Sequence, residues 1–308
     1  MLRRIVSFLP SATEMAFELG LGDSVLAVSH ECDYPAAAKS KPVVVRPVLP
    51  VERMAQAEID KNVTQRLRNG QSLYELDAGA IRDLSPDLIL TQDLCQVCAA
   101  SGNDATQLIA SLPRAPRVLS MTPKSLEDIF SSLLELGEAT GTLERARQLI
   151  ERARTRLASV ASRTQAAGKR VRVFCMEWLD PPYCCGHWVA DMIDVAGGID
   201  DLARRGTDSV RIAWEQVQSF APEVLVVMPC GFGLAKAATL AQGLRTLAGW
   251  NELAAVRNGR VYVVDANSYF ARPGLRVVEG TLLLAHLLHP RRVEWDGPPG
   301  AFQRLENG

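Results

Sequence analysis

The fold of this chain is decided by the stretch from Thr142 to Thr164, which reads TLERARQLIERARTRLASVASRT. Its apolar residues recur every three or four positions and form one stripe of a helix, whereas most other positions are charged. Gly141 and Gly168 flank the run and mark its ends. At ~1.5 Å per residue the helix is roughly 36 Å long. Alternating strands and helices lie on both sides, so we interpret it as a spine joining two α/β lobes; the alternative is a long helix within one larger domain.

The composition is that of a globular protein. The 308 residues suffice for two domains, with 47% hydrophobic and 22% charged residues. The formal net charge is −1 and no charge run stands out, so we expect neither a nucleic acid nor an anionic membrane surface as partner. No stretch approaches the ~18 apolar residues of a membrane span.

The N-terminal residues predict a strand rather than a secretion signal. Two arginines precede an apolar run that Pro10 interrupts, whereas the apolar region of a signal peptide has roughly 7–15 residues. We therefore expect a cytoplasmic protein, or a periplasmic one if a leader was removed. Ser11 and Glu14 have the spacing of a capping box, which predicts Ser11 as the cap of the first helix.

A proline, an acidic residue and an apolar strand follow one another twice. The two copies are Pro86-Asp87-Leu88-Ile89-Leu90 and Pro222-Glu223-Val224-Leu225-Val226, 136 positions apart at the prolines and on opposite sides of the spine. Parallel strands with covering helices are the expected result. We predict an α/β fold of two Rossmann-like lobes: an N-terminal lobe over 1–122, linking helices over 123–168 and a C-terminal lobe over 169–308.

Chemically unusual residues gather in the loops that follow the predicted strands. Ligands collect at the carboxyl ends of strands in α/β folds and in clefts between domains, so we expect these loops to border an interlobe cleft that holds a small molecule. Each residue has a structural alternative: the aromatic rings plug lobe edges, the histidine bonds to backbone, the arginine forms a salt bridge, and the acids are solvated. The predicted ligand-binding residues are Glu31, Gln92, Glu177, Trp178, Tyr183, His187, Trp188, Tyr269 and Arg272.

The seven cysteines do not form a disulfide pattern, because their number is odd and their spacing irregular. Cys95 and Cys98 form a Cys-x-x-Cys pair, which is compatible with a redox dithiol, half of a metal site, or two packed thiols. A zinc or iron–sulfur site needs further soft ligands, for which Cys230 is the first candidate. Cys32, Cys184 and Cys185 also fall on loops at the predicted cleft, whereas Cys175 lies in a strand and is expected in the core.

No motif of the common enzyme chemistries is present. The sequence contains no phosphate-binding Gly-x-x-x-x-Gly-Lys, no Gly-x-Gly-x-x-Gly after a strand, no Gly-x-Ser-x-Gly and no His-Glu-x-x-His. With four histidines, a Ser/His hydrolase has few candidate bases. We therefore expect a binding protein rather than an enzyme.

Several motifs resemble one transport family. The run RIVSFLPSATE from Arg4, Cys32-Asp33-Tyr34-Pro35 and the Pro-Asp-Leu-Ile strand resemble the cobalamin/iron-siderophore class of ABC-transporter substrate-binding proteins. The sequences Glu177–Pro182 and Gly186–Trp188 are similar to its cobalamin-binding-protein branch. The resemblance implies two Rossmann-like lobes, a rigid linking helix, and a ligand such as cobalamin or another corrinoid between the lobes.

Individual positions match the family unevenly. Tyr183 matches an aromatic residue that packs on the corrin, and Glu215 matches the second-lobe glutamate that docks on the permease. Gly79 stands where the first-lobe glutamate is expected, Gln92 replaces a Trp, and Glu31 with Cys32 replaces an aromatic residue. The resemblance thus implies an ABC permease partner with one of its two docking glutamates present.

The sequence favours a small-molecule binding protein whose ligand is a corrinoid or a similar metal chelate. The alternative is a cytoplasmic protein or enzyme that holds a metal or an iron–sulfur cluster at Cys95, Cys98 and Cys230. A third possibility is a transporter component at the membrane surface.

Overall fold

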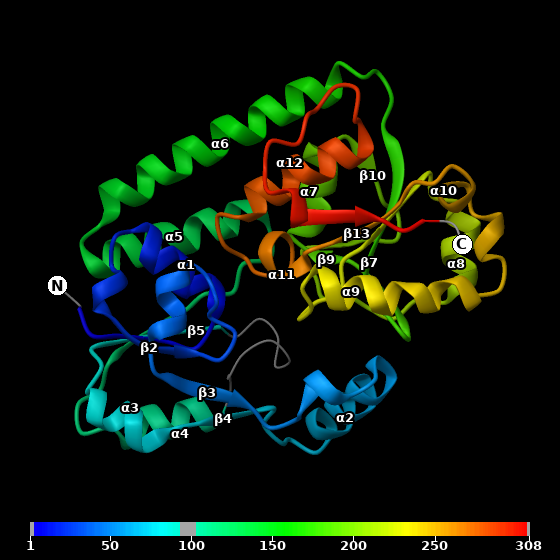
Figure 1. Cartoon of the computed structure of the whole chain (residues 1–308). Helices are drawn as coiled ribbons and strands as arrows, with labels where there is room; N and C mark the ends of the chain where they lie inside the picture. The colour runs from blue at the N-terminus through cyan, green and yellow to red at the C-terminus, as the bar shows by residue number, and fades with distance from the viewer. Residues whose placement is uncertain (1–2, 93–102, 307–308) are drawn as a thin grey trace. The chain divides into compact units, whose positions relative to one another are not determined.

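The computed structural model describes residues 3–92 and 103–306. The chain divides into two compact units. The first comprises Met1–Pro123 and Glu127–Ile150, and the second comprises Lys124–Leu126 and Glu151–Gly308. Each unit is built on one main sheet covered by helices, so the predicted α/β fold is confirmed (Figure 1).

The first unit is built on a six-stranded sheet in the order β4-β3-β2-β1-β5-β6. All neighbouring strands are parallel except β4, which pairs antiparallel with β3 and was not expected from the sequence. Central strands β1 and β5 are wholly buried, as expected for a parallel sheet covered on both faces. The strands are β1 (Ile5–Ser7), β2 (Val25–Ser29), β3 (Val43–Pro47), β4 (Tyr74–Leu76), β5 (Leu88–Thr91) and β6 (Arg117–Ser120).

The helices of the first unit begin with α1, which starts two residues earlier than the capping box predicted. Pro10 occupies its first turn and Leu9 is its N-cap, without a side-chain cap. The predicted cap at Ser11 is therefore wrong, because a proline is favoured at the first helical position and Ser11 is buried one step inside. The helices are α1 (Pro10–Glu18), α2 (Gln56–Arg68), α3 (Ala78–Leu84) and α4 (Asn103–Ser111).

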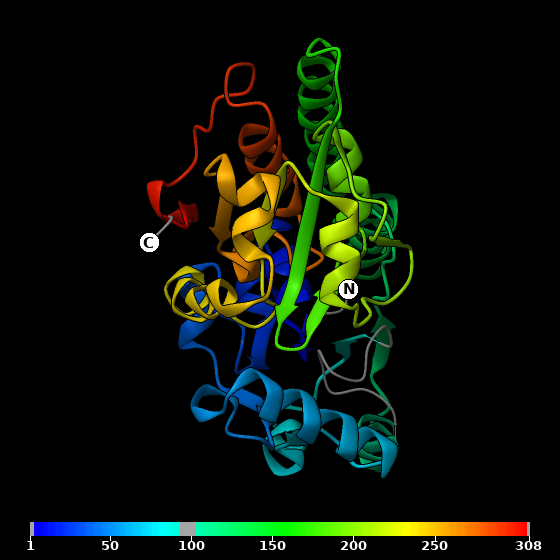
Figure 2. The same ribbon diagram turned by 90° about the vertical axis from the view of Figure 1, so that its right-hand side faces the viewer.

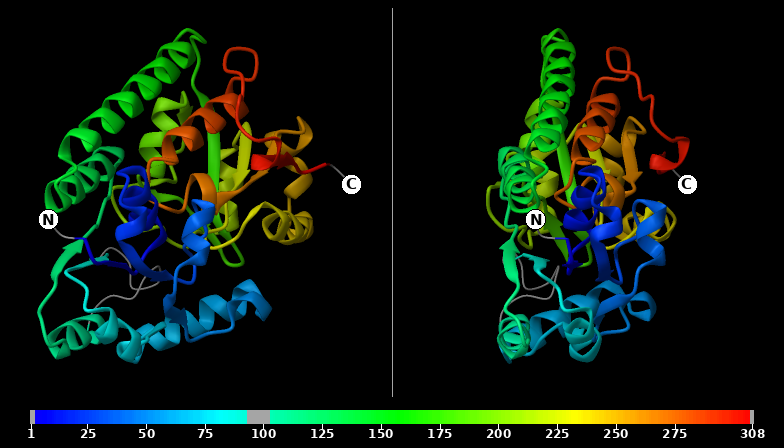
Figure 3. Two further views of the ribbon diagram at one scale, coloured as in Figure 1. Left: turned by 60° about the vertical axis from the view of Figure 1, so that its left-hand side comes forward. Right: turned by 90° about the vertical axis from the view of Figure 1, so that its left-hand side faces the viewer.

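The long helix predicted first in the sequence is α6 (Leu143–Gln165), and it follows α5 (Leu126–Thr140) after a short turn (Figure 3). The predicted apolar stripe is buried, including Ala146, Ile150 and Val160. A Cβ at Gly137 of α5 would lie 2.9 Å from Ala146 Cβ, so a glycine is required where these helices approach. Helix α6 begins in the first unit and ends in the second.

The main sheet of the second unit has the order β10-β7-β12-β13-β14, and β8 pairs with β7. The strands β10, β7, β12 and β13 are parallel, whereas β14 and β8 run antiparallel to their neighbours. Strand β9 pairs with β11 in a separate two-stranded sheet. The strands are β7 (Val171–Leu179), β8 (Pro182–Cys184), β9 (Gly186–His187), β10 (Gly198–Ile199), β11 (Arg204–Arg205), β12 (Val224–Val227), β13 (Val261–Val264) and β14 (Phe302–Arg304).

The helices of the second unit cover this sheet. Helix α7 packs on α12, and α9 lies against β13. Helix α12 is buried along almost its whole length, which explains why its sequence is apolar on all sides. The helices are α7 (Val189–Val195), α8 (Trp214–Phe220), α9 (Leu234–Ala241), α10 (Ala254–Arg257), α11 (Ala266–Tyr269) and α12 (Val277–Leu288).

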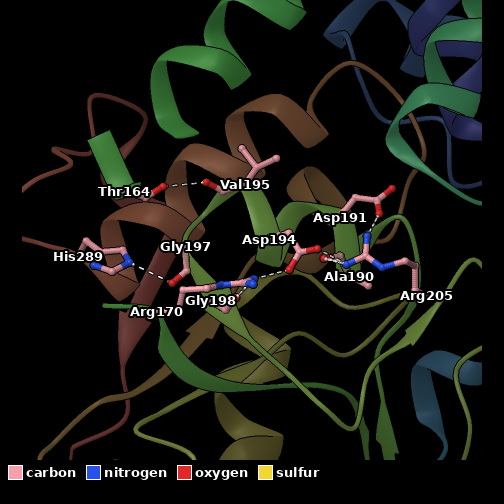
Figure 4. Close-up of polar contacts among 10 residues, drawn as sticks. All are labelled: Thr164, Arg170, Ala190, Asp191, Asp194, Val195, Gly197, Gly198, Arg205 and His289. Atoms are coloured by element: carbon pink, nitrogen blue, oxygen red, sulfur yellow. Dashed lines mark hydrogen bonds and ion pairs between the residues drawn. The ribbon is translucent and has the colours of Figure 1, made fainter. Parts of the chain in front are cut away.

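Polar contacts fix helix α7 at both its outer side and its C-terminal end (Figure 4). The guanidinium group of Arg205 contacts Asp191 and Asp194, and Arg170 contacts Asp194. At the end of the helix, Gly197 has φ +75° and its carbonyl accepts a hydrogen bond from His289 Nε2 at 3.2 Å. Burial lowers the pKa of His289, so its ring is neutral near pH 7 and Nε2 carries the donated proton.

No helix within residues 3–92 and 103–306 is both long and apolar enough to cross a membrane.

Substituting Gly197 should destabilise the second unit strongly. In Gly197→Ala, the new Cβ would lie 2.7 Å from His289 Nε2 and 2.8 Å from Thr164 Cβ, in addition to the strain of a positive φ. We expect a loss on the order of 3 kcal/mol in the free energy of unfolding, measured by chemical denaturation. Gly168→Ala is the matched control, because Gly168 has φ +70° with no atom within 4 Å. It should lose only about 1 kcal/mol, and equal losses would contradict the packing argument.

Candidate ligand-binding site

The carboxyl edge of the second unit's sheet is shaped by the turn that follows β7. Figure 2 shows β7 as the long green strand that turns back at its lower end into β8. In this hairpin Met176 pairs with Cys184 and Trp178 pairs with Tyr183, so Glu177 is the extra residue of a β-bulge. Bulges redirect side chains and are frequent beside functional sites. The strands β12 and β13 end at the same edge, because they run parallel to β7.

The carboxyl group of Glu177 is held by donors from two other segments. Its Oε1 accepts a hydrogen bond from the Gly186 amide at 3.3 Å, and its Oε2 accepts one from the Ser209 hydroxyl. Its main-chain carbonyl accepts from the Cys230 amide at 3.1 Å. Burial raises the pKa of Glu177 to about 7, although both side-chain hydrogen bonds favour the charged form. Glu177 therefore ties β7, β9 and the loop after β12 together, and its contact with a ligand stays a prediction.

The segment from β11 to Arg211 lies alongside β8 and β9. The His187 amide donates to the Thr207 carbonyl at 2.9 Å, and the Cys184 amide donates to the Val210 carbonyl at 3.1 Å. Gly186 is required here, since a Cβ would lie 2.6 Å from the Thr207 carbonyl oxygen. These contacts fix the backbone on which Tyr183 and His187 stand.

His187 is partnered by a carboxylate rather than by backbone. It has φ +50°, and its Nε2 lies 3.0 Å from Asp208 Oδ1. Its ring stacks on Trp188 with the centroids 5.5 Å apart. Burial lowers the pKa of His187, although Asp208 opposes this shift. The alternative of a backbone-bonded histidine is therefore wrong for this ring, and the role of His187 toward a ligand stays a prediction.

A row of aromatic and cationic side chains, here called the aromatic strip, crosses this edge. Trp178 lies 5.6 Å from Phe232, centroid to centroid, and Lys236 Nζ lies 5.0 Å from the Phe232 centroid. Tyr183, the strand partner of Trp178, accepts a hydrogen bond from Arg211 Nε at 2.9 Å. The guanidinium carbon of Arg211 lies 5.9 Å from the Tyr183 centroid. Trp178 and Tyr183 are half-buried.

Three other predicted residues are engaged inside the second unit. Trp188 is buried and its Nε1 donates to the Phe270 carbonyl at 2.8 Å. Tyr269 is half-buried and packs edge-on against Trp295 with the centroids 5.8 Å apart. Arg272 is buried. These positions agree with the alternative that the aromatic rings close the edge of a lobe, and their contact with a ligand stays a prediction.

The cysteines of the second unit are mostly core residues. Cys175, Cys184 and Cys185 are fully buried, so the expectation that Cys184 and Cys185 lie in open loops is wrong. A hydrogen bond with Cys175 and burial hold the pKa of Cys185 well above its ordinary value, and burial raises that of Cys175. Asp200 accepts a hydrogen bond from the Cys175 amide at 3.0 Å, and burial raises its pKa to about 7. Protonated, buried thiols are poor metal ligands.

The remaining metal candidates give no site. Cys230 is half-exposed in the loop after β12, and Cys32 is buried with its Sγ 3.1 Å from Thr13 Oγ1. Cys95 and Cys98 lie outside the described residues. In the described part of the chain, no three His, Cys, Asp or Glu side chains are grouped so as to hold a metal ion.

In the first unit, the predicted residues follow β2 and β5. Glu31 is half-buried, and its amide donates to Ser29 Oγ at 3.2 Å. Gln92 is buried directly after β5. Both stand at the carboxyl ends of parallel strands, as expected from the sequence. The docking candidate Glu215, in the second unit, is exposed in the first turn of α8.

Sequence reasoning missed several residues of the aromatic strip and its support. Ser209 and Arg211 precede α8 in a segment without periodicity, and Phe232 and Lys236 flank the start of α9. Asn267 accepts a hydrogen bond from the Gly231 amide at 3.1 Å and so holds the same loop. The only sequence signal was the position of Phe232 after a predicted strand, since the others depend on segments that pair far along the chain.

Comparisons with known proteins agree on one fold. The family described as periplasmic binding protein matches residues 5–268. The chain is 25% identical over 297 residues to the uncharacterized ABC transporter substrate-binding lipoprotein YvrC of Bacillus subtilis, covering 94% of this chain and 80% of that protein. It is 25% identical over 279 residues to a vitamin B12-binding protein of Vibrio cholerae, covering 90% and 85%. The crystal structure of a periplasmic heme binding protein from Pseudomonas aeruginosa superposes with a TM-score of 0.74 at 20% identity over the whole of both chains, which shows the shared fold.

The charge state of Glu177 should make stability depend on pH. Its pKa is about 7 in the folded protein against an ordinary value of 4.5, so its destabilising effect is absent below pH 4.5 and complete above pH 7. Glu177→Gln should therefore gain stability over the wild type as the pH rises from 4.5 to 8, by at most on the order of 3 kcal/mol. Thermal unfolding across this range measures the difference.

The control for this experiment is Glu223→Gln. A hydrogen bond from Lys169 lowers the pKa of Glu223, so this variant should lose stability relative to the wild type as the pH rises. A Glu177→Gln variant that follows the same sign as Glu223→Gln would contradict the assignment.

Proposed function

Because the chain belongs to the periplasmic binding protein family, we propose that it is the substrate-binding component of an ABC transporter and that it captures a metal-bearing tetrapyrrole or a similar metal chelate. The family match confirms the resemblance seen in the sequence motifs. Members of this family are substrate-binding proteins rather than enzymes. The chain is accordingly a small-ligand binding protein.

The observation that carries the ligand class is the aromatic strip. Trp178 and Tyr183 are paired across the β7–β8 hairpin, so their rings stand on the same face, and Phe232 extends that face. Aromatic rings provide a large, rigid apolar surface and lose little side-chain conformational entropy on binding, which suits a broad, flat ligand. The family relatives support the same class, since their descriptions name vitamin B12 and heme.

A permease partner follows from the same proposal. The relative in Bacillus subtilis is described as an ABC transporter substrate-binding lipoprotein. Glu215 is exposed on α8, where a carboxylate can pair with a basic group of a partner protein. We place the protein outside the cytoplasm, because the relatives are described as periplasmic or lipoprotein and give no support to the expected cytoplasmic location.

The alternative of a metal or iron–sulfur protein has no positive support. Cys32, Cys184 and Cys185, which also fell at the predicted cleft, are buried, and the described residues contain no grouped metal ligands. The relatives from Bacillus subtilis and Vibrio cholerae are described as a substrate-binding lipoprotein and a vitamin B12-binding protein. In the proposed function, a metal ion is therefore bound as part of the transported ligand and not by cysteines of the protein.

Removing the central ring of the aromatic strip should weaken ligand binding. Titration of the purified protein with hemin and with cyanocobalamin, followed by absorbance and tryptophan fluorescence, should give one-to-one binding of at least one of them. Trp178→Ala should raise the Kd by at least about tenfold, because truncating a large aromatic contact is among the most costly changes at a binding site. Tyr262→Leu is the matched control, since Tyr262 lies within β13 against Phe302.

Two results would contradict the proposal. One is the absence of binding for hemin, cyanocobalamin and a ferric siderophore at micromolar concentrations. The other is an unchanged Kd in Trp178→Ala, which would place the ligand away from the aromatic strip.

A further inference from the structure

Two cysteines of the second unit face each other across the β7–β8 hairpin. In this antiparallel hairpin Met176 is paired with Cys184, so the next residues in line are Cys175 and Cys185, which follows directly after β8. Because side chains alternate along a strand, these two share the face opposite that of Met176 and Cys184. Directly opposed residues of an antiparallel pair have Cα atoms about 4.5–5.5 Å apart, inside the range of roughly 4.4–6.8 Å that a disulfide spans.

The contacts of the two residues also place them side by side. A side-chain hydrogen bond joins Cys175 and Cys185. Both contact one carboxylate oxygen, since Asp200 Oδ2 accepts a hydrogen bond from the Cys175 amide at 3.0 Å and lies 3.9 Å from Cys185 Sγ. Neither residue is exposed to solvent. The strand register and the shared Asp200 oxygen therefore indicate independently that these cysteines are neighbours.

The other described cysteines have different neighbours. Cys184 Sγ lies 3.5 Å from the Val210 carbonyl oxygen, and Cys32 Sγ lies 3.1 Å from Thr13 Oγ1 in the first unit. Cys230 is half-exposed in the loop after β12. Within residues 3–92 and 103–306, Cys175 and Cys185 are thus the two cysteines that both register and contacts bring together.

We propose that Cys175 and Cys185 form a disulfide bond that closes the β7–β8 hairpin. The inference rests on the proposed function for its location, since a protein outside the cytoplasm meets disulfide oxidants whereas cytosolic thiols are kept reduced. Each thiol gives up one proton and one electron as the S–S bond forms. An exogenous disulfide such as oxidised glutathione takes up both protons and both electrons as its own S–S bond breaks into two thiols.

Burial limits when this bond can form. The hydrogen bond with Cys175 and burial raise the pKa of Cys185, so the thiolate that attacks a disulfide is scarce once the hairpin has packed. The exchange therefore takes place while the hairpin assembles and its thiols are still accessible. Asp200 keeps its partners after the Cys185 thiol is consumed, because it also accepts hydrogen bonds from the amides of Cys175 and Leu202.

The test refolds the full chain in a redox buffer. Reduced protein is unfolded in guanidinium chloride and diluted into reduced and oxidised glutathione, and free thiols are then blocked with N-ethylmaleimide. A second sample is exported to a bacterial periplasm behind an added signal peptide, so the result does not depend on refolding. Cyanogen bromide cleaves after methionine, which leaves Cys175 as the one cysteine of fragment 122–176 and puts Cys184 and Cys185 in fragment 177–192. Mass spectrometry with and without reductant shows whether the fragments are joined.

We expect the two fragments to be joined in most of the protein and to separate on reduction. The oxidised protein should unfold at a temperature at least about 3 °C above that of the reduced protein, because the bond restricts the unfolded chain. Cys185→Ala should abolish both the joined fragments and the temperature difference. Cys184→Ala is the matched control, since Cys184 is adjacent and equally buried, and it should keep both.

The outcomes separate this inference from the proposed function. Separate fragments in the wild type, or joined fragments in Cys185→Ala, would overturn the disulfide and leave the proposed function standing. Joined fragments in a protein that binds no ligand of the proposed class would overturn the proposed function alone. If Cys185→Ala does not fold, the wild-type fragments and the Cys184→Ala control still decide whether Cys175 is bonded to Cys185.

Discussion

The hydrogen bonding of β7 is the constraint on which the second unit depends. This strand pairs with β10 and β12 in the parallel sheet and with β8 in the hairpin, so both of its edges are occupied. A strand paired on both edges and covered on both faces must be apolar, and residues 173–176 are fully buried. The pairing of β7 with β12 ends at Met176, just before the bulge at Glu177, whereas its pairing with β8 continues through Trp178 and Leu179. Trp178 and Tyr183 are presented at the edge because the sheet partners of β7 fix where it ends.

The buried carboxyl groups of Glu177 and Asp200, which lie behind that edge, fix how the neighbouring segments pack. Glu177 and Asp200 have lost hydration, which raises the pKa of each carboxyl to about 7, yet each accepts hydrogen bonds from main-chain amides. A buried acid that is bonded in this way costs less than an unpartnered one and specifies which segments meet. Burial shifts the pKa of His187 and of His289 in the opposite direction, below the ordinary value.

The family relationship and the local chemistry answer different questions. The match over residues 5–268 establishes the kind of protein, a ligand-binding component built on a shared α/β fold. A relative at about one quarter identity that is described as a vitamin B12-binding protein does not establish the ligand of this chain. The choice between such ligands depends on a few side chains at the strand ends. Here those side chains are aromatic rings flanked by an arginine and a lysine.

The sequence by itself determined the α/β class, the long helix α6, the central strands and the family, because these follow from periodicity and from motifs contiguous in the chain. It also placed the ligand-binding candidates at the ends of strands, where parallel topology brings them together. It missed β4, β14 and the pairing of β9 with β11, because short strands are stabilised by partners distant in sequence. It misjudged Cys184 and Cys185 for the same reason, since their burial depends on the β7–β8 hairpin and on the segment around Val210. Only the tertiary structure decided that Arg211 lies on Tyr183 and that Ser209 binds Glu177, because local sequence patterns do not encode contacts between residues about 30 positions apart.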